Sequence, residues 1–135
     1  MKTFELLDIF EFKYPDNWKH WFDKESGLEC FCEDSENAVG VLQVSFYTSK
    51  TKTFNAFEEQ AGHESAEIIT LNGNLTVYFE ETKTDFKTIY WVTGENDIML
   101  CLTYTFNLKS NFEHELEEVR KILTTLRIKT GTQQT

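Results

Sequence analysis

Cys30 and Cys32, separated by one residue, are the first side chains whose chemistry could serve redox or nucleophilic reactions. Such reactions need a thiol with a lowered pKa, which nearby cations provide. This stretch carries Glu29 and Glu33 instead. A free cysteine also behaves as a small buried hydrophobe. We therefore predict that both thiols pack in the core, on the face of a strand opposite to Glu29 and Glu33.

The three histidines, His20, His63 and His114, lie in three separate segments. His114 and Glu118 are four residues apart, a spacing that suits one helix face, but two ligands do not make a metal site. We expect no metal and no cofactor.

The sequence also lacks a suitable pair of carboxylates and the known catalytic motifs. Glu80 and Glu81 are neighbours on a predicted strand and therefore point to opposite faces. The sequence has no Gly-rich phosphate loop, no Gly-x-Ser-x-Gly and no Cys-x-x-Cys. We predict no catalytic residues and favour a non-catalytic protein, with an enzyme kept as the rival.

The net charge of the chain limits the classes of partner that we expect. The formal net charge is -10. Nucleic acids and anionic lipids attract Lys and Arg, so we expect neither a nucleic acid nor a membrane as partner. An acidic surface suits a basic protein, although it also simply maintains solubility. Residues 1–10 contain Glu5 and Asp8 and lack the apolar core of a signal peptide, and the cysteine count is odd; both features favour a cytoplasmic protein.

Alternating apolar residues predict most of the strands. Apolar side chains occupy every second position in residues 10–14, 28–32 and 42–46, which is typical of half-buried strands. Residues 18–24 form a mixed aromatic segment that we predict to be a short strand. Thr53 is expected to cap a short helix that ends at Gly62.

Two hairpins are predicted in the second half of the chain. Residues 68–71 and 75–79 flank Asn-Gly-Asn, and residues 88–93 and 98–106 flank Gly-Glu-Asn-Asp. Together they predict a meander of four consecutive antiparallel strands.

The C-terminal segment is predicted to be a long helix of about four turns. Ser110 and Glu113 have the spacing of a capping box. The apolar stripe that follows consists of Phe112, Leu116, Val119, Leu123 and Leu126. The predicted fold class is α+β, an antiparallel meander with a short middle helix and a long C-terminal helix packed on it. Residues 1–129 are expected to form a single domain and residues 130–135 a flexible tail.

Residues 10–18, with the sequence FEFKYPDNW, resemble the aromatic strand and Tyr-Pro turn followed by Trp that mark PsbP-like proteins. The order of elements is also similar, so the chain resembles small bacterial members of unknown function in that superfamily. The resemblance implies a shared fold but no shared chemistry.

Large aromatic side chains that border polar groups are typical of partner-binding surfaces. On this basis Trp21, Tyr78 and Trp91 are the candidate partner-binding residues. The strand over 88–93 has two possible registers, one exposing Trp91 and the other exposing Tyr90.

The leading hypothesis is a non-catalytic binding or interaction domain that engages a basic protein, as an immunity or inhibitor protein would. The protein would be a monomer or a homodimer through the same face. The rival hypothesis is a small enzyme or ligand carrier with a pocket between the sheet and the helices.

Overall fold

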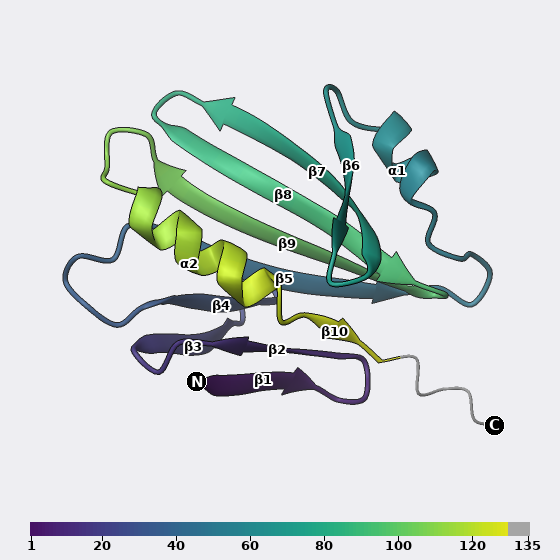
Figure 1. The fold of residues 1–135 in the computed structure, drawn as a ribbon, viewed down its shortest axis with the longest axis horizontal. Coiled ribbons are helices and arrows are strands. Elements are labelled where there is room, and N and C mark those ends of the chain that lie inside the picture. The colour runs from purple at the N-terminus through teal and green to yellow at the C-terminus, as the bar shows by residue number, and fades with distance from the viewer. Residues whose placement is uncertain (130–135) are drawn as a thin grey trace.

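The computed structural model describes residues 1–129, which form two antiparallel sheets and two short helices (Figure 1). The smaller sheet has the strand order β1-β2-β10, and the larger sheet has the order β3-β4-β5-β9-β8-β7-β6. The elements are β1 (Lys2–Leu6), β2 (Phe10–Tyr14), β3 (Trp18–Asp23), β4 (Leu28–Glu33), β5 (Val41–Thr48), α1 (Ala56–Ala61), β6 (Glu67–Leu71), β7 (Asn74–Lys83), β8 (Phe86–Glu95), β9 (Ile98–Asn107), α2 (Glu113–Leu123) and β10 (Arg127–Ile128).

Strong alternation in the central strand β9 explains how the larger sheet is oriented. Its even-numbered residues are buried and its odd-numbered residues are only partly buried. Strands β6 to β9 follow one another in the sheet, as the two hairpins require. At the first hairpin, Asn72 and Gly73 both have positive φ, the backbone conformation that an Asn-Gly turn tolerates.

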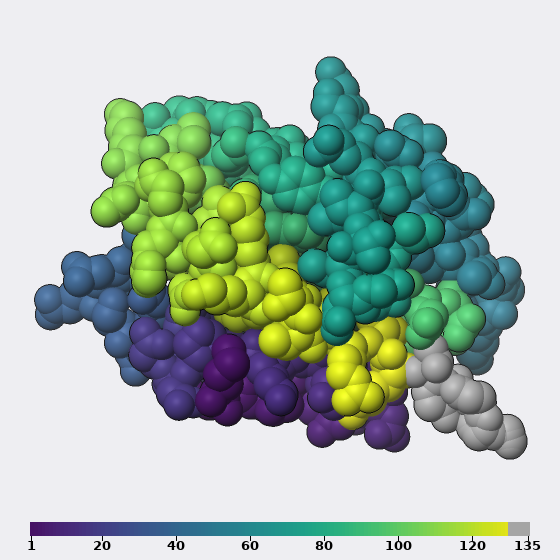
Figure 2. Space-filling view, in the orientation of Figure 1, coloured from purple at the N-terminus to yellow at the C-terminus, as the bar shows by residue number. Residues whose placement is uncertain are grey.

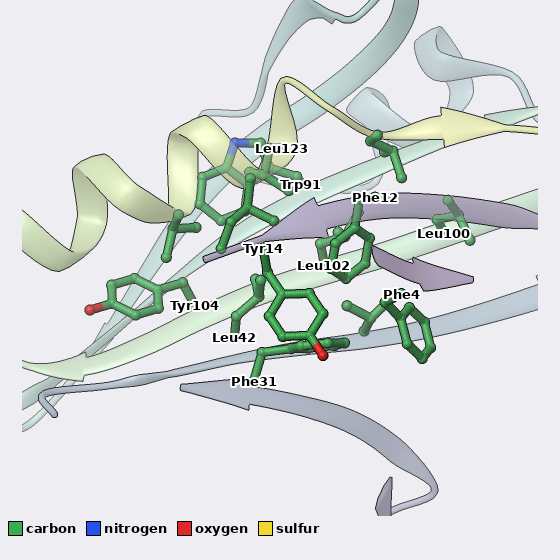
Figure 3. Packing of buried hydrophobic residues seen from close by; sticks show 14 of the residues in the cluster. Phe4, Phe12, Tyr14, Phe31, Leu42, Trp91, Leu100, Leu102, Tyr104 and Leu123 are labelled. Atoms are coloured by element: carbon green, nitrogen blue, oxygen red, sulfur yellow. The ribbon is translucent and has the colours of Figure 1, made fainter. Parts of the chain in front are cut away.

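The main core lies between the larger sheet, the smaller sheet and α2. Figure 2 shows α2 lying between the N-terminal strands and strands of the larger sheet. The smaller sheet and α2 therefore cover one face of the larger sheet. Figure 3 shows side chains from both sheets and from α2 meeting in this core. Its fully buried side chains include Trp18, Phe12, Phe31, Leu102 and Tyr104. We call this face of the larger sheet the core face.

The predicted α+β class with a long C-terminal helix is wrong, because the molecule is mainly β, with 52% strand and 13% helix. The helix α2 has 11 residues and ends at Leu123. The Thr124 and Thr125 hydroxyls donate to the carbonyls of Lys121 and Ile122. Such side-chain bonds compete with helix continuation. The chain then forms β10 against β2 instead of a fourth helical turn.

Both predicted helix caps also differ from the structure. Ser110 donates its hydroxyl to the Asn107 carbonyl, and α2 begins after Phe112 without a side-chain cap. The α1 cap is Asn55, whose side chain accepts from two backbone N–H groups, and not Thr53. The tail predicted at 130–135 lies outside the described residues.

Candidate binding face

The face of the larger sheet opposite to the core is the candidate site, and strand register defines it. Side chains that are paired across neighbouring antiparallel strands lie on the same face. Following the pairs from one side of the sheet to the other gives one row across β3, β4, β5, β9, β8 and β7: Trp21, Cys30, Gln43, Thr103, Tyr90 and Phe79. We call the face that carries this row the outer face.

The middle of the outer face carries no Asp, Glu, Lys or Arg. Strands β5, β9 and β8 direct the following side chains to it: Val41, Gln43, Ser45, Tyr47, Phe86, Thr88, Tyr90, Val92, Met99, Cys101, Thr103, Thr105 and Asn107. Charged residues make up 27% of the chain, so their absence from the outer face of three adjacent strands is a local feature. Depletion of charge is the compositional mark of the centre of a protein interface.

The helix α1 covers only one end of the outer face. Ala56 packs with Val77 and Val92, and Phe54, Phe79 and Met99 border this small second core. Farther along the sheet, Tyr90, Thr103 and Gln43 remain partly exposed. This part of the face is accessible to a partner.

Aromatic side chains lie toward both ends of the row. Phe79 and Tyr90 stack with ring centroids 4.5 Å apart, and His63 stacks on the other side of Phe79 at 4.0 Å. At the opposite edge of the sheet Trp21 is 40% exposed, with the Lys19 ammonium 5.8 Å from its ring centroid. The row therefore offers apolar contact area at both ends and neutral hydrogen-bonding groups between them.

The structure separates the three aromatic residues selected from the sequence. Trp21 lies on the outer face, whereas Tyr78 and Trp91 are paired with each other on the core face. Trp91 is 3% exposed and lies close to Leu123 of α2 in the core (Figure 3). Of the two registers for β8, the structure adopts the one that directs Tyr90 away from the core.

Tyr78 is partly buried beside Trp91, with ring centroids 5.9 Å apart. Its hydroxyl donates to the Glu80 carboxylate. Burial, with the adjacent Glu80 charge, raises the pKa of Tyr78 to about 12. It is therefore a neutral hydrogen-bond donor at physiological pH.

The thiols are unsuited to nucleophilic chemistry. Cys30 and Cys32 are buried, but they lie on the outer face, and Phe31 between them packs in the main core. Burial raises the pKa of Cys30, Cys32 and Cys101, so all three stay protonated at neutral pH.

A pocket of about 270 Å³ opens where the outer face meets α1. Tyr47, Met99 and Phe54 provide apolar walls. Carboxylates of Glu58, Glu59 and Asp97 line it as well, together with the residues Thr48, Ser49, Lys52, Thr53, Asn55 and Ile98. The pocket thus combines apolar walls with three acidic residues and Lys52, whose ammonium lies 3.9 Å from Glu58.

Histidines pair with carboxylates at two places without lining a pocket themselves. His63 Nε2 lies 2.7 Å from Glu59, and His20 Nε2 lies 2.5 Å from Glu29. Both histidine rings also stack on phenylalanines, His63 on Phe79 and His20 on Phe31. A general acid or base must reach its substrate, and of each pair only the acidic residue, Glu59 or Glu29, lines a pocket.

Glu115 is a buried carboxylate that sequence reasoning missed. It is 1% exposed and accepts hydrogen bonds from the backbone N–H groups of Val39 (2.9 Å) and Gly40 (2.7 Å) and from the Tyr104 hydroxyl (2.5 Å). Burial and the neighbouring Glu115 carboxylate raise the pKa of Glu33. These three bonds are structural, because they join α2 to the segment between β4 and β5 and to β9.

Within residues 1–129, no group of three or more His, Cys, Asp or Glu side chains is arranged to hold a metal ion. In the same part of the chain, neither helix has the length and apolarity needed to cross a bilayer.

Comparison with known proteins places the fold but not an activity. The family described as "Domain of unknown function (DUF3805)" matches residues 7–135. No curated protein sequence matches the chain. A crystal structure from Bacteroides thetaiotaomicron VPI-5482 is similar over 96% of this chain, with a TM-score of 0.80 and 18% identity; the match spans 49% of that protein, so this chain is about half its length.

Two other solved structures are similar at 11% identity. Cyanobacterial PsbP (CyanoP) from Synechocystis sp. PCC 6803 matches over 94% of this chain and 91% of its own, with a TM-score of 0.66. LpqN of Mycobacterium tuberculosis, described as involved in cell envelope biogenesis, matches over 89% and 83%, with a TM-score of 0.54. At these identities the similarity shows a common fold alone.

Proposed function

This chain belongs to the DUF3805 family of domains of unknown function, and we propose that it is a non-catalytic binding domain that docks a basic protein on its outer face. The observation that carries the proposal is the uncharged centre of that face in an otherwise acidic molecule. An interface of standard size needs about 800 Å² on each partner, and the accessible rows of β5, β9 and β8 provide an extended surface of suitable chemistry.

The acidic lining of the 270 Å³ pocket supports a basic partner. A Lys or Arg side chain can lay its aliphatic stem along Phe54 and Met99 while its charge approaches Asp97. Glu58 lies 3.9 Å from the chain's own Lys52 ammonium. The net charge of -10 adds long-range attraction for a cationic protein and repels a second copy of the chain. Charge therefore favours a basic protein over a homodimer as the occupant.

The proposal is tested by capture from the native host with the full chain as bait. The informative variant is Thr103→Lys, because it places one charge at the centre of the outer face on a partly exposed strand position. We expect loss of one specific basic partner, with a drop in affinity of at least about tenfold. The matched control is Thr124→Lys, the same charge change on exposed surface at the end of α2.

Several outcomes would contradict this function. One is capture of the same partners by Thr103→Lys and by the unaltered chain. Another is a dimeric mass in light scattering that Thr103→Lys converts to a monomer, which would assign the face to a second copy. Purified partner that binds equally well in low and high salt would contradict the charge argument.

We also infer that the chain is a distant member of the PsbP-like superfamily. The similarity to CyanoP and the aromatic strand that ends at Tyr14-Pro15 support this inference. A cytoplasmic location is likewise our proposal, supported by the odd number of cysteines.

A further inference from the structure

A second pocket, of about 430 Å³, lies between the two sheets and away from α1. It opens because β4 and β5 separate: only Leu42–Val44 of β5 pair with β4, while β5 continues to Thr48. The β3–β4 turn, with Ser26 and Gly27, borders the opening.

The walls of this pocket are apolar. Leu6 of β1 and Phe10 of β2 come from the smaller sheet, and Phe22, Val44 and Phe46 come from the larger sheet. Phe10 and Phe46 have ring centroids 6.3 Å apart, so the inner end is formed by the main core. A volume above about 300 Å³ and apolar walls are typical of small-molecule sites.

Glu29 provides a charge in this apolar setting. Its side chain is 17% exposed and lines the pocket, and its Oε1 is 2.5 Å from His20 Nε2. The His20 ring in turn contacts the rings of Phe4 and Phe31, with centroid distances of 4.9 and 4.7 Å. The hydrogen bond to His20 therefore holds the Glu29 carboxylate in position.

The charge of the lining selects the kind of ligand. Its residues are Leu6, Phe10, Phe22, Ser26, Gly27, Leu28, Glu29, Val44, Ser45, Phe46 and Tyr47, which include one acid and no Lys or Arg. An anionic head group would be repelled by Glu29, whereas an ammonium group would be attracted to it.

We propose that this pocket binds a small primary amine with an apolar chain, its ammonium group beside Glu29 and its chain against Phe10, Phe22 and Phe46. Ser26 and Gly27 border the opening, and Ser45 and Tyr47, whose side chains belong to the outer face, also line the pocket. The amine is proposed to contact Glu29, Phe10, Phe22 and Phe46 on the core-face side, whereas the protein partner is proposed to dock on the outer face, so the two proposals are tested independently.

The experiment titrates the isotope-labelled full chain with octylamine, octanol and octanoate and follows backbone amide shifts by NMR. We expect shifts confined to residues 27–29 and 44–47, and an affinity for octylamine about tenfold above that for octanol. Octanoate should bind still more weakly. Ethylamine, which has the same head group without the chain, should give no localised shifts.

Two variants separate the roles of head group and chain. Glu29→Gln should make the affinities for octylamine and octanol equal. Phe22→Ala should weaken both ligands several-fold, and the 52% exposure of Phe22 keeps the loss of stability small. Glu67→Gln, an exposed acid on the opposite edge strand, is the matched control and should change nothing.

The proposal is overturned if none of the three eight-carbon probes shifts the pocket amides, or if ethylamine gives the same pattern as octylamine. A tenfold preference for octylamine that survives in Glu29→Gln would also overturn it, because the ammonium would then lie elsewhere.

Discussion

Replacing each of two tryptophans by alanine should lower stability by very different amounts if the register of the larger sheet is as described. Trp91 is 3% exposed and packs in the main core, whereas Trp21 is 40% exposed on an edge strand. Removing a buried Trp side chain costs about 3–5 kcal/mol of stability through lost burial and a residual cavity. Trp21→Ala keeps the core intact and should cost about 1 kcal/mol or less.

The difference is large enough to measure by thermal unfolding. For 135 residues, an unfolding entropy of about 2.1 cal/mol/K per residue makes 1 kcal/mol correspond to about 3.5 °C. Trp91→Ala should therefore lower Tm by about 10–18 °C, and Trp21→Ala by about 4 °C or less.

Fluorescence gives an independent readout of the same register. Of the three tryptophans, Trp18 and Trp91 are buried and Trp21 is exposed. Acrylamide should quench the unaltered chain in two classes, and Trp21→Ala should remove the accessible class. Tm losses of equal size, or quenching that survives Trp21→Ala and disappears in Trp91→Phe, would refute the assignment of faces.

Three further changes test the surroundings of Glu115, Gly40 and Glu33. Glu115→Gln brings amide hydrogens toward the Val39 and Gly40 N–H groups. We expect the free energy of unfolding in denaturant to fall by about 1–3 kcal/mol and the backbone amides of both residues to exchange faster. Unchanged exchange at these amides would contradict this. Gly40→Ala should cost about 1–3 kcal/mol because the new Cβ overlaps the Thr105 carbonyl oxygen, while a neutral effect on Tm would contradict the close approach. The pKa of Glu33 is raised in the folded chain, so its contribution to stability is present below the unfolded pKa of about 4.5 and is lost as pH rises through the folded pKa. Glu33→Gln should therefore raise Tm at pH 7 more than at pH 4. The exposed control Glu36→Gln should not show this difference.

Period-two alternation predicted most strands because one side of each strand is buried. It did not decide the register of β8, because Trp91 and Ile89 on one side and Tyr90 and Val92 on the other are all apolar or aromatic. The choice depends on β9, where Leu102 is buried and Thr103 is partly exposed, and these pair with Trp91 and Tyr90 respectively. Cross-strand pairing is long-range information that one segment does not contain.

The C-terminus was overestimated as helix for a related reason. The apolar stripe continues to Leu126, which is buried whether or not the backbone is helical. The two-residue strand β10 is specified by its pairing with Phe10 and Glu11 of β2 and carries no local signal. Glu115, in contrast, did have a signal, since it precedes Val119 and Leu123 at helical spacing on the buried stripe of α2.

The docking face is tested most directly by side-chain oxidation footprinting of the chain with and without its captured partner. Trp21 and Phe22 are adjacent in β3 and both are exposed. The side chain of Trp21 lies on the outer face, whereas that of Phe22 lies on the core-facing side. We predict that the partner protects Trp21 and Tyr90 while oxidation of Phe22 stays unchanged. Protection of Phe22 with continued oxidation of Trp21 and Tyr90 would contradict the account.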